Sequence, residues 1–409
     1  MSHLRKLIFR VGMILLMLVS VPLSTPQAQA QGGIVVENAT VAVNFGQTIT
    51  FSAKITAPLP IQQVSLLFRG VAEEATRVES VQVAQDGSVN LTYDVSQNVF
   101  PPFGSIVFWF QATLSDGQTY TSAPITFPYN DNRFPWRETT RNNVTVHWYA
   151  GDDAFGSAAL DAAAKGMLVM NEFIQTSLTE PVNIYIYSNI PDLQNTLMLG
   201  GQEWVGGHAS PEIGVVLVAV APGAGQSIEM ETEIPHELAH VMLYRSLGSK
   251  YKNQPTWLLE GLASMMELYP NPDYARAMEI ASQNNSLLAF ENLCDSFPAD
   301  AGNAFLAYAQ SQSFVNYIRE TYGTSGLGRL TNSYGDGFPC ELGATNALGT
   351  PLSQLESRWR ENVLGQNVAG VATRNLSPFI LLMLLVLVVP IWGGIDMLIQ
   401  RRKRANQSK

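Results

Sequence analysis

Residues 233–240 read Glu-Ile-Pro-His-Glu-Leu-Ala-His and contain the spacing H-E-x-x-H. On a helix, residues four positions apart lie on one face, so His236 and His240 can both point at one Zn²⁺. Glu237 lies beside them, where a carboxylate can take a proton from a water that the metal activates. Thr232 is a candidate N-cap, and Pro235 would then fall in the first turn, where a missing N–H costs little. The stretch predicts a buried helix that carries two metal ligands and a general base.

A catalytic zinc site usually has three protein ligands and one open position. The extended pattern H-E-x-x-H-x-x-G-x-x-H would need Gly at 243 and His at 246, where the chain has Leu243 and Ser246. The third ligand could instead be a carboxylate from the next helix. Residues 255–263 read Pro-Thr-Trp-Leu-Leu-Glu-Gly-Leu-Ala, and Glu260 is the only acid among them. Because a buried carboxylate without a partner is costly, Glu260 is the predicted third ligand.

These two segments resemble the gluzincin zinc peptidases, and more narrowly the peptidase-MA-like domain, whose pattern is H-E-x-x-H followed by W-L-x-E-G-x-A. Residues 307–317 are similar to a later helix of that family, A-Y-x-x-S-x-S-F-V. The resemblance covers about residues 140–365. It implies an α+β zinc peptidase fold, a metal site of His236, His240 and Glu260, catalysis by Glu237, and a hydrogen bond from Tyr308 to the oxyanion.

The resemblance also implies that the strand before the metal helix is a sheet edge, to which the substrate backbone adds. Residues 213–220 would be this edge, with Gly214, Val215 and Val216 in contact with substrate; the alternative is an ordinary buried strand. His208, in the preceding loop, either contacts substrate or is incidental. Glu267, seven residues after Glu260, either hydrogen-bonds to a metal ligand and orients it or is an exposed helix acid.

Aminopeptidases of this clan resemble one another in a G-x-M-E-N strand whose glutamate binds the free N-terminus. Here residues 210–214 read Ser-Pro-Glu-Ile-Gly, so the motif is absent and Glu212 is a loose match. The choice between endopeptidase and aminopeptidase therefore stays open.

The rest of the chain predicts a multidomain, membrane-anchored protein. Basic residues, an apolar run and Ala-Gln-Ala at 28–30 indicate a signal peptide, and short alternating segments with turn residues indicate an immunoglobulin- or fibronectin-like β-sandwich. An apolar run with one charge indicates a C-terminal transmembrane helix, and the basic cluster after it belongs on the cytoplasmic side. The predicted parts are the signal peptide (1–30), β-sandwich (33–128), zinc peptidase domain (137–365), linker (366–376), transmembrane helix (377–399) and basic cytoplasmic tail (400–409).

Net charge and cysteine content indicate which partners to exclude and whether a disulfide is expected. Removing the three basic residues of the first thirty positions and the five of the last nine leaves 16 basic residues against 34 acidic ones. A body this acidic argues against a nucleic-acid partner. Cys294 and Cys340 are the two cysteines of the chain, and in an exported protein such a pair favours a disulfide.

Together these features predict a single-pass cell-membrane protein with an outer zinc metallopeptidase domain that hydrolyses a peptide or protein substrate. The alternative is a surface binding or adhesion protein that keeps the metal site without turnover.

Overall fold

The computed structural model describes residues 33–96, 99–173, 179–198, 206–366 and most of 376–399. The described residues form two compact units. The first holds the chain up to residue 96 and residues 105–128, and the second holds residues 99–104 and the chain from 129 onward.

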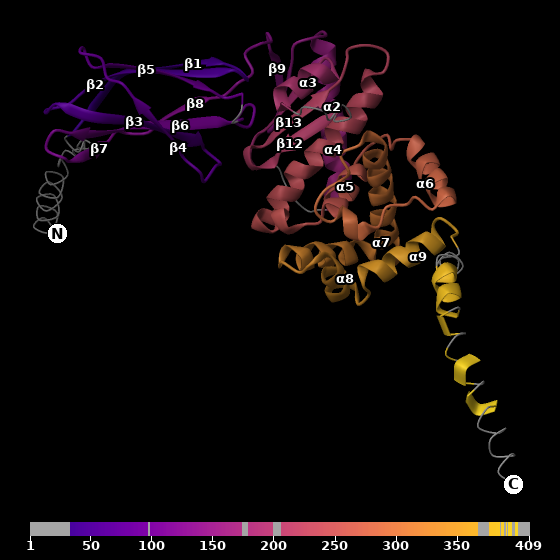
Figure 1. Ribbon diagram of the computed structural model, residues 1–409. Helices are drawn as coiled ribbons and strands as arrows, with labels where there is room; N and C mark the ends of the chain where they lie inside the picture. Colours follow the sequence, from indigo (N-terminus) through magenta and orange to yellow (C-terminus); the bar gives the residue numbers. More distant parts are fainter. Residues whose placement is uncertain are drawn as a thin grey trace, which may run out of the picture. The chain divides into compact units, whose positions relative to one another are not determined.

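The first unit consists of two antiparallel sheets that pack face to face (Figure 1). Side chains alternate between buried and accessible along most strands, as a sheet with one solvated face requires. Phe51 of one sheet contacts Phe68 and Phe108 of the other, with ring centroids 5.2 Å apart in both pairs. One sheet has the order β1-β2-β5, formed by β1 (Val35–Asn44), β2 (Thr48–Thr56) and β5 (Ser88–Asp94). The other contains β3 (Ile61–Gly70), β4 (Arg77–Val81), β6 (Ser105–Leu114), β7 (Thr119–Thr121) and β8 (Ile125–Pro128).

The second unit begins with a mixed sheet of order β12-β13-β11-β10-β9. Its strands are β9 (Arg137–Arg141), β10 (Val144–Trp148), β11 (Val182–Tyr187), β12 (Gly207–Ser210) and β13 (Val215–Ala219). The three central strands are parallel and largely buried, whereas β9 and β12 pair antiparallel at the two edges. Parallel strands buried on both faces read as continuous apolar runs, which is the pattern of residues 215–218.

One face of this sheet is covered by α2 (Asp153–Asn171) and α4 (Gln226–Leu247), which share a hydrophobic core with it. Asp152 caps α2 by accepting a hydrogen bond from the N–H of Phe155. Gly156 permits the close approach of α2, because a Cβ atom there would lie 2.4 Å from the Trp148 ring.

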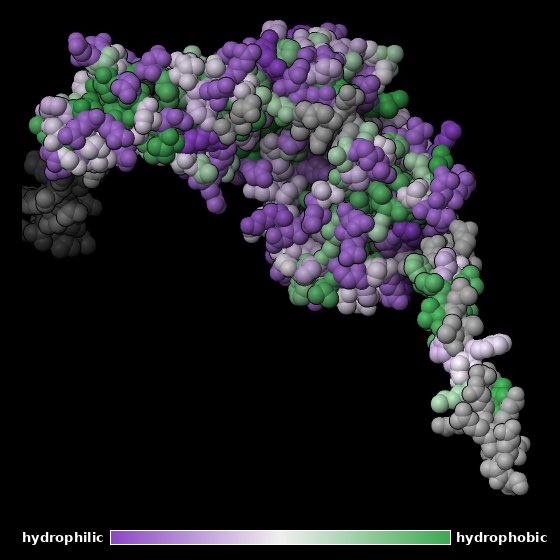
Figure 2. Space-filling view, in the orientation of Figure 1, coloured by the Kyte–Doolittle hydropathy of each residue, from purple (hydrophilic) through white to green (hydrophobic). Residues whose placement is uncertain are grey.

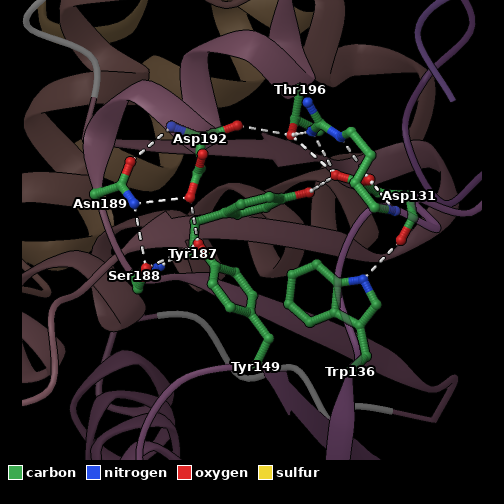
Figure 3. A network of polar contacts seen from close by, with 9 residues as sticks. Asp131, Trp136, Tyr149, Tyr187, Ser188, Asn189, Asp192 and Thr196 are labelled. Atoms are coloured by element: carbon green, nitrogen blue, oxygen red, sulfur yellow. Dashed lines mark hydrogen bonds and ion pairs between the residues drawn. The ribbon is translucent and has the colours of Figure 1, made fainter.

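The opposite face of the sheet is closed by α3 (Ile190–Leu197) and by residues 129–136 around a buried carboxylate (Figure 3). Asp131 is fully buried and pairs with Arg133, and it accepts hydrogen bonds from the hydroxyls of Tyr187 and Thr196. Trp136 donates its indole N–H to the carbonyl of Asp131 over 2.7 Å. A buried carboxylate with this many donors costs little, so the segment can lie against the sheet without an unsatisfied charge.

The helical half of the second unit surrounds another hydrophobic core, in which Trp257, Phe290, Phe314 and Trp359 are fully buried. A disulfide joins Cys294 to Cys340 beside this core. The longest of the described helices, which spans Ala301–Gly335, bends at Gly323, whose φ of 71° lies in the left-handed region that glycine tolerates. The elements of this half are η2 (Gly248–Asn253), α5 (Thr256–Ser264), α6 (Asp273–Asn284), η3 (Phe290–Leu293), α7 (Ala301–Gly335), α8 (Cys340–Leu348) and α9 (Leu352–Asn362). The short 3₁₀ turn η1 (Pro211–Ile213) joins β12 to β13 in the sheet.

The C-terminal segment corrects the sequence prediction. Across the described part of the chain, no helix is both long enough and apolar enough to cross a bilayer. Residues 376–384 are exposed and all but Ser377 are apolar, which gives the green atoms near this end of the chain in Figure 2. The predicted transmembrane helix at 377–399, membrane anchoring and single-pass location are therefore wrong. The predicted signal peptide, the basic tail and residues 367–375 of the linker lie outside the described residues.

Candidate metal centre

The helix that carries the H-E-x-x-H spacing starts earlier than the sequence predicts. It begins at Gln226, so Thr232 is not its N-cap and Pro235 lies in its interior. Pro235 has no N–H to donate to the carbonyl of Glu231, four residues earlier. The N–H of Leu268 donates to that carbonyl instead, over 2.9 Å. The Thr232 hydroxyl donates to the carbonyl of Tyr269, so α4 holds the chain segment that follows α5.

His236, His240 and Glu260 converge where α4 and α5 meet. Their candidate ligand atoms all lie within 4.8 Å of one another. Glu260 Oε2 is 3.3 Å from His236 Nε2 and 3.5 Å from His240 Nε2. Both histidines are buried and Glu260 is partly buried, so the three groups are largely shielded from solvent.

These distances fit a tetrahedral zinc ion. Ligand atoms bonded to Zn²⁺ at about 2.0–2.1 Å in a tetrahedron are separated by about 3.3–3.4 Å. The two separations from Glu260 to the imidazoles are close to this value. Two imidazoles and one carboxylate are also the donor types of a catalytic zinc site that keeps its fourth position open. The residues present therefore fit the ion.

The second nitrogen of each imidazole is held by another side chain. His236 Nδ1 lies 2.9 Å from the carboxylate of Glu267, which is buried, so Glu267 is not an exposed helix acid. His240 Nδ1 lies 3.2 Å from the hydroxyl of Tyr251. Such contacts fix the ring orientation and the tautomer that leaves Nε2 available to a metal. The sequence contains no signal for Tyr251, which lies in a short 3₁₀ segment.

Glu237 projects from the same turn of α4 towards strand β12. A Cβ atom at Gly207 would lie 2.5 Å from Glu237 Oε1, so the carboxylate is packed directly against the glycine backbone. Burial raises the pKa of Glu237 above its ordinary value, although the neighbouring His236 and His240 oppose the shift. A carboxylate with a raised pKa is suited to accept and return a proton near neutral pH.

The protonation of the ligands is set by their proximity. Burial alone would lower the pKa of His236, but its contacts with Glu260 and Glu267 raise that pKa well above the ordinary value. Burial would raise the pKa of Glu260, but His240 and His236 together hold it well below its usual range. The carboxylate of Glu260 is therefore ionised, as a metal ligand must be.

Tyr308 of α7 lies beside the same group. Its ring centroid is 6.0 Å from that of His236 and 4.9 Å from that of Phe297. Burial and then the charges of Glu260 and Glu237 raise the pKa of the hydroxyl well above its ordinary value, so the hydroxyl keeps its proton and can donate.

The residues predicted to contact substrate are placed differently from the prediction. Gly214, Val215 and Val216 are buried, and β13 lies inside the sheet between β12 and β11, so residues 213–220 are not the edge. The edge near α4 is β12, which contains His208. Glu212 lies in the exposed turn η1.

His208 is close enough to His240 for their charges to interact. The pKa of His208 is lowered, first by desolvation from the surrounding protein and then by the charge of His240. The four residues of β12, with Gly207 among them, are too few to show strand alternation, which is why this edge was missed.

Comparison with known proteins identifies the second unit. Residues 162–365 match the family model of the peptidase MA superfamily. A search of the curated proteins gave no match.

Similarity to solved structures is slight and carries no argument about this chain. A carbohydrate-binding module of family 56, described as a β-1,3-glucan binding domain, is 12% identical, with a TM-score of 0.17 over 23% of this chain and 96% of its own. A structure described as a myokine is 15% identical, with a TM-score of 0.20 over 24% of this chain and 97% of its own. Wild-type OgpA from Akkermansia muciniphila is 11% identical, with a TM-score of 0.21 over 25% of this chain and 30% of its own.

Proposed function

We propose that residues 162–365, which belong to the peptidase MA superfamily, form a zinc-dependent peptidase that hydrolyses peptide bonds. The observation that carries this proposal is that the ligand atoms of two imidazoles and one carboxylate lie within 4.8 Å of one another, with the buried carboxylate of Glu237 next to His236 in the sequence. His236, His240 and Glu260 would hold the ion. When bound there, zinc supplies a Lewis acid that acidifies water and polarises a carbonyl group.

The chain's own residues would perform the proton transfers. Glu237 accepts a proton from the attacking water and returns it to the leaving amine, a task that its raised pKa favours. Tyr308 donates a hydrogen bond to the oxygen on which negative charge develops, a contribution of about 3–4 kcal/mol for a well-placed donor. Glu267 and Tyr251 orient the two imidazoles.

The open edge of β12 provides a place for an extended substrate. β12 pairs with β13 on one side, and no described strand pairs with its other side. A peptide that adds to this edge would run beside α4, which packs against β12. The position of the cleaved bond within the substrate, and so the distinction between endopeptidase and aminopeptidase, is left to the experiment below.

Glu237→Gln tests this function because it removes the base and keeps the side-chain shape. We expect the zinc-loaded wild type to cleave members of a proteome-derived peptide library, and the zinc-loaded variant to lose at least about 10³-fold of that activity. Zinc content should be one ion per chain in both proteins. Mass spectrometry of products locates the cleaved bonds, and acetylated peptides separate aminopeptidase from endopeptidase activity.

Glu231→Gln is the matched control, because it makes the same change on the same helix at a residue that pairs with Lys165 of α2. It should cleave like the wild type. If the zinc-loaded wild type cleaves nothing, the peptidase proposal is rejected, and a protein that holds metal without turnover becomes the better description.

A further inference from the structure

Glu233 lies on the metal-binding face of α4, one helical turn before Glu237. Its carboxylate is next to Gly206, because a Cβ atom at Gly206 would lie 3.3 Å from Glu233 Oε2. Gly207 lies next to the carboxylate of Glu237 in the same way, because a Cβ atom there would lie 2.5 Å from Glu237 Oε1. Two consecutive glycines therefore run past two carboxylates, of which one is the proposed general base.

No residue of the described chain forms a hydrogen bond or an ion pair with the Glu233 carboxylate. The charged groups around it are His236 and three acids, Glu229, Glu237 and Glu267. Burial raises the pKa of Glu233 to about 7. By contrast Glu231, two residues earlier, pairs with Lys165. A partly buried carboxylate among other acids is costly to ionise, and a cation that binds beside it would remove this cost.

The backbone of β12 shows how a peptide would reach Glu233. The carbonyl of Gly206 accepts from the N–H of Ala219, so residues 206, 208 and 210 hydrogen-bond towards β13. The N–H and C=O groups of Gly207 and Ala209 therefore face the open edge. A peptide paired there passes Glu237 at Gly207 and then approaches Glu233 at Gly206.

Geometry also indicates which part of the peptide meets Glu233. One helical turn of about 5.4 Å separates the two acids, and an extended chain advances about 3.3 Å per residue, so they are about two substrate residues apart. In the antiparallel arrangement, which is slightly the more stable, the substrate runs against β12. Its residues near Gly206 then follow the cleaved bond.

We propose that Glu233 determines specificity by binding a cationic group of the peptide, carried by a lysine or arginine side chain just after the cleaved bond. This inference rests on the proposed peptidase function. The other cation of a peptide is its free α-amino group, which precedes the cleaved bond and would reach Glu233 only if the substrate paired in the parallel direction.

The test uses one quenched fluorescent peptide scaffold in matched forms on the zinc-loaded full chain. Lysine or arginine replaces glutamine at each of the two positions after the cleaved bond, and neutral peptides carry either a free or an acetylated N-terminus. We expect the wild type to cleave the lysine and arginine peptides with a kcat/KM about tenfold or more above that of the glutamine peptides, the range of a charge-assisted contact. Glu233→Gln should reduce this ratio to near one, whereas Glu231→Gln should leave it unchanged.

The ratio within each protein is the readout, so partial misfolding of a variant cannot mimic the result. An equal rate for cationic and neutral peptides in the wild type, or an unchanged preference in Glu233→Gln, overturns the proposal. A preference for the free N-terminus that Glu233→Gln abolishes supports the cation site and identifies the α-amino group as its ligand.

Binding of the same peptides to the Glu237→Gln protein, with and without Glu233→Gln, is measured by fluorescence anisotropy. Because it needs no turnover, this measurement separates failure of the cation site from failure of the peptidase proposal. Tighter binding of the cationic peptides that depends on Glu233 supports the inference, and equal affinities overturn it.

Discussion

The carbonyl of Glu231 and the backbone N–H of Leu268 are joined by a 2.9 Å hydrogen bond that exists because Pro235 cannot supply the usual helical donor. The bond fastens the chain immediately after Glu267 to the helix that carries both candidate histidine ligands. Glu267 is thereby placed 2.9 Å from His236 Nδ1. A proline inside a helix is thus used here to position a ligand's partner.

Glu267→Ala should weaken zinc binding about 10–100-fold, because His236 loses the acceptor that orients its ring. Glu267→Gln keeps an acceptor oxygen, so zinc affinity should fall less in this variant than in Glu267→Ala. Competition with a fluorescent chelator measures both dissociation constants. Glu279→Ala, an exposed change on α6, is the control. Equal zinc affinity in wild type and Glu267→Ala would show that this contact does not orient the ligand.

Gly207→Ala should reduce kcat/KM by about 10²-fold, because the added Cβ would lie 2.5 Å from Glu237 Oε1 and displace the proposed base. Zinc content should not change, because the atoms nearest to the added Cβ all belong to Glu237 and none belongs to a proposed zinc ligand. Steady-state kinetics and metal analysis measure the two effects. Gly328→Ala adds a Cβ with no atom within 4 Å and should be neutral. Full activity of Gly207→Ala would argue against Glu237 as the base.

Tyr308→Phe should lower kcat by about 10²-fold with little change in KM, because the hydroxyl is proposed to act on charge that develops only in the transition state. Tyr269→Phe, at a half-exposed tyrosine, is the control. A change confined to KM would assign Tyr308 to ground-state binding instead.

Replacing both Cys294 and Cys340 by serine should lower the free energy of unfolding by up to ~4 kcal/mol, as expected for a cross-link across 46 residues. It should also weaken zinc binding. The carbonyls of Cys294 and Asp295 accept the backbone N–H and the hydroxyl of Thr256, the first residue of α5, which carries Glu260. Urea unfolding and chelator competition measure the two quantities. A loss of stability with unchanged zinc affinity would show that α5 holds its position without the cross-link.

Glu233→Gln should stabilise the metal-free protein at pH 8 and not at pH 4. The pKa of Glu233 is about 7 in the folded protein, above its ordinary value of 4.5. The wild type is therefore unaffected below pH 4.5 and loses stability as the pH rises through about 7, because ionisation is disfavoured only when the protein is folded. The upper limit of this loss is about 3 kcal/mol, reduced by the solvent that reaches the side chain. Thermal unfolding in the presence of a chelator, as a function of pH, measures it. Equal melting temperatures at pH 8 would contradict the buried charge.

The sequence predicted the parts of the site whose chemistry is local. His236, Glu237 and His240 share one helical turn, and an acid in an apolar segment identified Glu260. Relationships across the chain were less accessible: nothing near Glu267 indicates whether that acid is buried or exposed. The start of α4 was misplaced because Thr232 and Pro235 imitate a helix N-terminus, while the bond that permits an interior proline comes from Leu268. The predicted transmembrane helix shows that an apolar run alone does not establish a membrane span.

The candidate ligands come from two helices that pack mainly in different hydrophobic cores. Most buried residues of α4 pack with the sheet and α2, whereas Trp257, Leu258 and Leu262 of α5 pack with α7 and α9. An ion held by both helices would therefore cross-link the two cores, which could otherwise unfold one after the other.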